Sequence, residues 1–149
     1  PQVLAASAAR AIVYVDAALP AATGPTPLAP PALREHLAGL ADADGMLPPW
    51  TQWWHDTTGL FPDDATRALI EERQPRLPLR YFDGSVASPA GWQERPQAFL
   101  AFGSTYAEEL ERAVALGWPT RRFDGGHLHL LHDPVLVAEA VLDLCRELR

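Results

Sequence analysis

The sequence contains no lysine and no asparagine, so its twelve basic residues are all arginine. The first absence excludes a lysine nucleophile, and the second excludes N-glycosylation. The one cysteine, Cys145, cannot form a disulfide within the chain, which is typical of a reducing compartment. We therefore expect a cytoplasmic protein, with Cys145 as a small core residue on the apolar stripe of the last helix.

Long apolar runs are also missing, and the first residues lack the basic-then-apolar pattern that directs secretion. The net charge of −7 disfavours binding to nucleic acid or to an anionic membrane surface. The 149 residues are 48% apolar and 21% charged, as in an ordinary globular domain. We expect neither nucleic-acid nor membrane partners.

Two short, largely apolar runs are predicted strands, at residues 11–15 and 97–102, and a third strand is predicted at residues 120–123. Helical periodicity follows the second strand at residues 106–116 and the third strand at residues 134–145. Alternating strands and helices are typical of a parallel sheet with right-handed crossovers. The expected fold class is α/β, with three parallel strands and flanking helices.

The starts of these helices carry recognisable capping residues. Asp133 followed by Pro134 is typical of a helix start, since aspartate caps the helix and proline suits its first position. Ser104 or Thr105 is the expected N-cap of the preceding helix. A further short helix is expected at residues 2–8.

Residues 20–96 differ in composition from the rest and hold most of the 15 prolines, with helical patterns at residues 31–41 and 63–72. A proline-rich and tryptophan-rich insertion between two strands is typical of a cap over a pocket. Its tryptophans either line that pocket or form the core of the cap itself, and both interpretations stay open. They are Trp50, Trp53, Trp54 and Trp92.

A histidine follows the third predicted strand, on a turn that contains Gly125, Gly126 and His127. Glycine lets the backbone turn sharply and leaves the next side chain free to reach a cleft. Ligands bind at the carboxyl ends of strands in open α/β sheets, so His127 is a candidate general base. A structural or surface histidine and a metal ligand are the alternatives, although no carboxylate or cysteine ligand clusters with it. We expect His129 and His132 on a turn and a short extended segment, as pocket-wall or surface residues.

Three features of the sequence together resemble the α/β-hydrolase superfamily. They are Asp16 after the first strand, the aromatic insertion, and the Gly125-Gly126-His127 turn before an Asp-Pro helix. The resemblance is to small cap-bearing, esterase-like and dehalogenase-like members, and it covers nearly the whole chain as the C-terminal portion of such an enzyme. It implies that the three strands are the sixth to eighth of an eight-stranded sheet. Residues 20–96 would be the cap, and residues 1–19 and 97–149 would belong to the core.

The family uses a triad of nucleophile, acid and histidine, with the histidine last in the sequence. The resemblance assigns that histidine to His127, and Asp16 stands where some dehalogenase-like members carry the acid. Such a carboxylate would accept the Nδ1 hydrogen of His127 and stabilise the imidazolium. The other position for the acid, after the second strand, holds Tyr106, which leaves Glu108 or Glu109 as the less favoured choice. The glutamates can equally be helix-start charges, and Asp16 can simply bond loop amides.

The nucleophile of this triad is missing, because the sequence contains no Gly-x-Ser-x-Gly elbow. We therefore expect the C-terminal fragment of a hydrolase for a small, apolar ester or acyl substrate, inactive alone and needing no cofactor and no metal. Dehalogenation or hydroxynitrile-lyase chemistry on the same fold is one alternative. A non-catalytic chain whose exposed sheet edge pairs with another polypeptide or a second copy is another. The expected substrate contacts are Trp50, Trp53, Trp54, Trp92, Tyr106 and Leu128.

Overall fold

The computed structural model describes residues 10–88 and 91–148, so the helix expected at residues 2–8 lies outside the described residues. The chain folds as two compact units, and each is described by itself. The insertion unit is Thr23–Ala87, and the sheet unit is formed by the described residues on either side of it. The insertion is thus shorter than the expected residues 20–96, since the segment that leads into the second strand belongs to the sheet unit. No helix in the described part of the chain is both long and apolar enough to cross a membrane.

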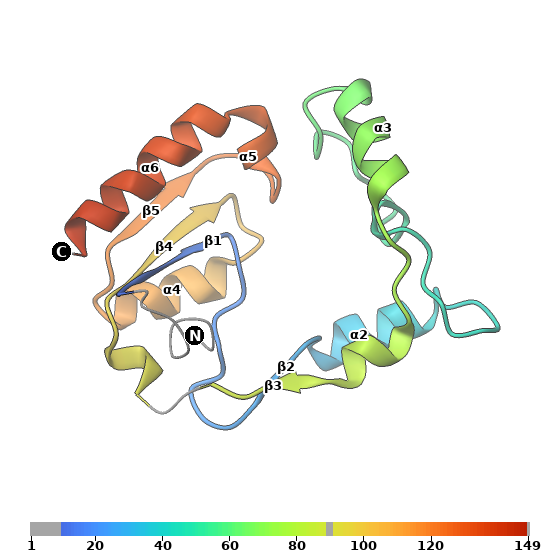
Figure 1. Cartoon of the computed structure of the whole chain (residues 1–149), viewed down its shortest axis with the longest axis horizontal. Helices are drawn as coiled ribbons and strands as arrows, with labels where there is room; N and C mark the ends of the chain where they lie inside the picture. Colours follow the sequence, from blue (N-terminus) through green and yellow to red (C-terminus); the bar gives the residue numbers. More distant parts are fainter. Residues whose placement is uncertain (1–9, 89–90, 149) are drawn as a thin grey trace. The chain divides into compact units, whose positions relative to one another are not determined.

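The sheet unit alternates strands and helices, as the sequence predicts (Figure 1). Its elements are β1 (Ile12–Val15), the 3₁₀ turn η3 (Trp92–Glu94), β4 (Gln97–Phe102), α4 (Ala107–Ala115), β5 (Thr120–Phe123), α5 (His129–His132) and α6 (Pro134–Glu147).

The three strands form one parallel sheet in the order β1-β4-β5, which confirms the α/β class with three parallel strands and flanking helices. All six residues of β4 are buried, because this central strand has a neighbour on each side and packing on both faces. Phe99 and Ala101 face the side of the sheet where Ala113 of α4 packs. Leu100 and Phe102 face the opposite side, against α6. The sheet therefore lies between two helical layers (Figure 1).

Capping confirms one expected helix start and corrects the other. The Asp133 carboxylate accepts a hydrogen bond from Leu136 N–H at 2.9 Å and caps α6, whose first residue is proline. The N-cap of α4 is Tyr106, which caps with no side-chain bond. The expectation of Ser104 or Thr105 is wrong, because a turn closed by Ser104 C=O and Ala107 N–H precedes the helix.

Cys145 is exposed, so its expected place in the core is also wrong. The buried residues of α6 are Val137, Ala140 and Leu144, at helical spacing. The next residue after Leu144 is turned about 100° round the helix and points away from the sheet.

The insertion unit has little regular structure beyond two α-helices (Figure 1). Leu37 and Leu47 are fully buried in it, and Arg76 donates to the carbonyl of Leu47 and pairs with Asp42. Its elements are β2 (Thr26–Pro27), α2 (Pro31–Ala38), the 3₁₀ turns η1 (Trp50–Gln52) and η2 (Leu79–Asp83), α3 (Asp64–Arg73) and β3 (Ser85–Val86), with β2 and β3 paired antiparallel.

Candidate active site

Asp16 lies directly after β1 and is fixed at three points, two of them on the neighbouring strand β4. Its N–H donates to the carbonyl of Leu100 at 2.7 Å, and its Oδ1 accepts from Phe102 N–H at 2.8 Å. The residue is 2% exposed, so its carboxylate must find partners inside the protein. Its φ of 42° is a left-handed value that no other non-glycine residue in the described part of the chain adopts. Such a strained backbone persists only where the surroundings enforce it, and it often marks functional sites.

His127 is the third point of attachment for Asp16. The turn after β5 brings its Nδ1 to 2.7 Å from Asp16 Oδ2, although the two residues are 111 positions apart in the sequence. The two side chains come from β1 and β5, the strands on either side of β4, and meet beyond the carboxyl end of the central strand. The His127 side chain is 46% exposed whereas that of Asp16 is 1% exposed.

This geometry determines which nitrogen of His127 carries the hydrogen. Both oxygens of an ionised carboxylate can only accept, so the Nδ1 of His127 donates to Asp16 and Nε2 is left unprotonated in the neutral ring. Asp16 is the only hydrogen-bond partner of this ring among residues 10–88 and 91–148. Nε2 can therefore accept a proton from a group that approaches the exposed edge of the imidazole.

Two glycines bring the strand ends close enough for this contact. Gly103 follows β4 with a φ of +56°, and a Cβ there would lie 2.2 Å from the carbonyl oxygen of Gly125. The N–H of Gly103 donates to Phe123 C=O at 2.9 Å, so the chain leaves β4 alongside the last residue of β5. No side chain fits between the two loops, and the position of the His127 turn depends on this approach.

The ring of His129 packs against the turn that carries His127. Contrary to the expected extended segment, His129 and His132 lie on the one-turn helix α5 with their ring centroids 6.4 Å apart. The ring of His129 packs 5.4 Å from that of Phe102 and 6.0 Å from that of Phe123. A Cβ at Gly125 would lie 2.6 Å from its Nδ1. His129 thus packs beneath the turn, where its buried Nε2 has no hydrogen-bond partner among the described residues.

Tyr106 is the aromatic neighbour of the candidate base, with its ring centroid 5.5 Å from that of His127. Burial raises the pKa of the Tyr106 hydroxyl, and the negative charges of Asp16 and Glu109 raise it further. The phenol is therefore neutral at physiological pH and can donate a hydrogen bond beside the histidine.

The remaining candidates from the sequence near His127 are Glu108, Glu109 and Leu128. Glu108 and Glu109 lie in the first turn of α4, and neither bonds to His127 in the described part of the chain. Asp16 is therefore the carboxylate that the fold brings to the histidine. Leu128 is half-buried between His127 and α5.

The tryptophans expected in the cap separate into two groups. Trp50, Trp53 and Trp54 lie in the insertion unit, where Trp53 donates to Pro48 C=O at 2.8 Å and Trp54 stacks on a histidine of α2. Trp92 is 5% exposed in the core of the sheet unit, 6.2 Å from Trp118. Trp92 is thus a core residue in this structure and not a side chain of the insertion. The sequence could not show this, because the packing of Trp92 depends on Trp118, which is distant in the sequence.

Two site features were not anticipated from the sequence, namely the Gly103–Gly125 approach and the packing of His129. A glycine within two residues of the end of each of two predicted neighbouring strands was the available signal for the first. The second had no signal, because a histidine between leucines has no distinctive pattern. Within residues 10–88 and 91–148, no three His, Cys, Asp or Glu side chains are arranged to hold a metal ion.

Comparison with protein-family models, curated proteins and solved structures finds no match to the chain. The argument on function therefore depends on the geometry of Asp16 and His127.

Proposed function

We propose that His127 is the general base, and Asp16 the orienting acid, of an α/β-hydrolase that cleaves small, apolar ester or acyl substrates. The observation that carries the proposal is the 2.7 Å contact between His127 Nδ1 and a carboxylate that is buried and anchored to β4. A histidine on the protein surface needs no such carboxylate. A catalytic histidine does, since the carboxylate selects its tautomer and stabilises the imidazolium.

The proposed reaction follows from the open Nε2. A hydroxyl nucleophile attacks the ester carbonyl while Nε2 of His127 takes its proton, and the imidazolium then gives that proton to the departing alkoxide. In the second half, Nε2 takes a proton from water as the water attacks the acyl group, and the nucleophile recovers its hydrogen. Asp16 stays ionised throughout. Tyr106, neutral beside the ring, is placed to contact the substrate.

The arrangement of the sheet unit supports the same family. Three consecutive parallel strands in the order β1-β4-β5, with α4 and α6 on opposite faces, fit the sixth to eighth strands that the sequence resemblance implies. The insertion unit enters between the first two of these strands, where the proposed cap belongs. In this proposal the strand ends of the sheet unit carry the chemistry.

The nucleophile and the oxyanion hole are proposed to come from polypeptide outside residues 1–149. The sequence has no Gly-x-Ser-x-Gly elbow that could supply them. The described part of β1 pairs with β4 only, so its other edge is open to further strands. The same observation favours a second candidate, a non-catalytic chain that completes its sheet with another polypeptide.

The kinetic test measures hydrolysis of p-nitrophenyl butyrate by residues 1–149 and by the protein together with any residues encoded ahead of them. We expect turnover only in the longer protein, with a loss of about 10⁴-fold in Asp16→Asn. His127→Gln should lose at least as much, whereas His55→Gln, an exposed histidine of the insertion unit, should be unaffected. Turnover by residues 1–149 that His127→Gln abolishes would contradict the need for an outside nucleophile.

A spectroscopic test addresses the pair itself, without any substrate. The ¹⁵N shifts of His127 should report the Nδ1–H tautomer in the wild type. In Asp16→Asn the amide oxygen must still accept from Phe102 N–H, so the amide NH₂ faces Nδ1 and forces the hydrogen onto Nε2. An unchanged tautomer in that variant would show that Asp16 does not orient the ring. Measuring the mass in solution distinguishes the second candidate, which predicts a stable complex and no hydrolysis.

A further inference from the structure

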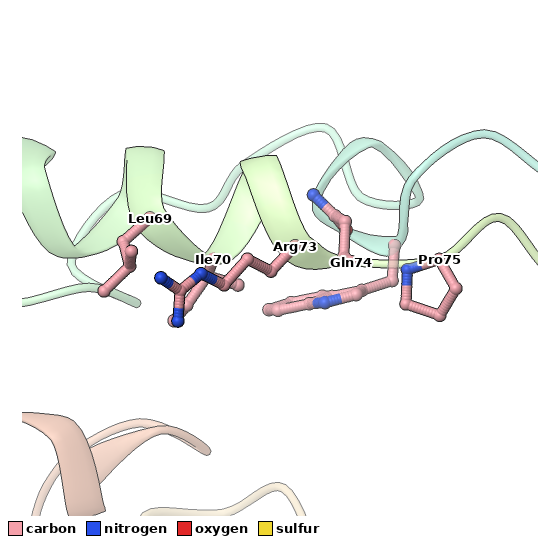
Figure 2. A pocket seen from close by; sticks show the side chains of 6 residues that line it. Leu69, Ile70, Arg73, Gln74 and Pro75 are labelled. Carbon is pink, nitrogen blue, oxygen red and sulfur yellow. The ribbon is translucent and has the colours of Figure 1, made fainter.

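The insertion unit has a groove whose lining residues all come from that unit. It has a volume of about 400 Å³ and is bounded by α3 and η1 (Figure 2). Pockets that hold small organic ligands have volumes of roughly 300–1,000 Å³. The residues that line it are Trp50, Leu69, Ile70, Arg73, Gln74 and Pro75.

The floor and walls of the groove are mostly apolar. α3 buries none of its residues fully, and Leu69 is 48% exposed. The indole of Trp50 is held by Phe61, with the two ring centroids 6.0 Å apart. The one amide in the lining is already satisfied, since Gln74 bonds to the backbone N–H and to the hydroxyl of Thr51. An apolar chain could therefore lie here without leaving that amide unpaired.

The guanidinium of Arg73 is available to a ligand. Three arginines of the insertion unit pair with carboxylates, whereas Arg80 and Arg73 have no ion-pair partner among the described residues, and of these two Arg73 lines the groove. It lies in the last turn of α3 and reaches into the groove beside Ile70 (Figure 2). The paired arginines are Arg34 with Asp83, Arg67 with Glu71, and Arg76 with Asp42.

We propose that this groove binds an unbranched aliphatic carboxylate. The chain lies along Trp50, Leu69 and Ile70, and the carboxylate pairs with the guanidinium of Arg73, which can bind both of its oxygens. The argument depends on charge complementarity: the guanidinium of Arg73 lies at the edge of an apolar surface with no ion-pair partner among the described residues, which calls for an apolar ligand with an anionic end. The proposal does not require His127 or hydrolysis.

The experiment follows decanoate binding to the whole chain by ¹H–¹⁵N NMR, using the five tryptophan indole N–H signals. Trp50→Phe assigns the signal in the groove by removing it. We expect saturable shifts at Trp50, with a Kd below about 1 mM. Arg73→Gln should weaken binding about tenfold, because it removes a charge-assisted hydrogen bond. Leu69→Ser, at an exposed position, should weaken it through lost apolar contact.

Three controls make the outcome decisive. Arg80→Gln removes an exposed arginine of the same unit outside the groove and should leave the Kd unchanged. Decanol, which lacks the charge, should bind the wild type no more tightly than decanoate binds Arg73→Gln. His127→Gln should bind decanoate normally even if it loses all hydrolysis, so the two proposals fail separately.

Several results would overturn the proposal. They are the absence of a saturable shift at Trp50, equal affinity for decanol and decanoate, or an equal effect of the two arginine variants. Shifts confined to Trp92 and Trp118 would place the ligand in the sheet unit and overturn it too.

Discussion

Replacing Gly103 by alanine tests whether the approach of two strand-end loops builds the candidate site. The added Cβ would lie 2.2 Å from the carbonyl oxygen of Gly125, and Gly103 is itself held to the sheet by the bond from its N–H to Phe123 C=O. Real Cβ contacts almost never fall below 3.0 Å, so the two loops must move apart. His127 follows Gly125 by two residues, and its bond to Asp16 lengthens with this movement.

The expected loss of stability in Gly103→Ala has two parts, a backbone cost and a steric cost. A non-glycine residue at a left-handed φ costs roughly 1–2 kcal/mol, and Gly103 has a φ of +56°. Forcing an extra methyl group into closely packed structure costs roughly 1–3 kcal/mol. Gly103→Ala should therefore lower the free energy of unfolding by about 2–5 kcal/mol.

Replacing Gly117 by alanine separates the backbone cost from the steric cost. Gly117, just after α4, has a φ of +73° and no atom within 4 Å of a Cβ placed there. Gly117→Ala should therefore lower the free energy of unfolding by only about 1–2 kcal/mol. Urea unfolding followed by circular dichroism gives both free energies. The Nδ1 proton signal of His127 reports whether its bond to Asp16 survives.

The reasoning fails if Gly103→Ala is no more destabilising than Gly117→Ala, because the steric contact would then contribute nothing. It also fails if Gly103→Ala is strongly destabilised but keeps an unchanged Nδ1 proton signal. In that case the loop approach stabilises the fold without positioning the histidine.

Two further predictions concern the rest of the sheet unit. Asp133→Ala removes the carboxylate that accepts from Leu136 N–H at 2.9 Å and should lower the free energy of unfolding by about 1 kcal/mol. Asp143→Ala, an exposed aspartate in the middle of the same helix, should change it far less in the same urea titration. Burial raises the pKa of Tyr14 to about 12. The unfolded state therefore loses this proton first, and stability should fall as pH rises from about 10 to 12. Tyr14→Phe should flatten that fall in a pH series of unfolding measurements, and an equal slope in both proteins would show that another group is responsible.

The sheet unit was largely predictable because its strands are locally distinctive. Residues 98–102 form an unbroken apolar run after Gln97, and β4 has the predicted bounds of 97–102 because a central parallel strand is buried on both faces. Asp133 and Pro134 marked the start of α6 because capping is a local property. The pairing of Asp16 with His127 could be proposed from the family resemblance, and the fold permits it because both residues follow strands of one parallel sheet, whose carboxyl ends share an edge.

The remaining features depend on contacts that local sequence does not encode. Trp92 is predicted to be an insertion residue because it lies in the proline-rich segment, yet it packs against Trp118, far along the chain. Cys145 lies on an apolar helix, but its exposure depends on a rotation of one residue relative to the sheet. The helical turn at His129 is too short to show periodicity.

The placement of the insertion between β1 and β4 has a consequence for how the chain reaches its native state. β4, α4 and β5 are consecutive, so their contacts close short loops, whereas Asp16 meets Phe102 across 86 residues. Closing the longer loop costs about 1 kcal/mol more in chain entropy, and distant pairings form slowly. We expect the β4–β5 pair to form early and β1 to dock last, so that the buried carboxylate and the histidine meet only in the final step of folding.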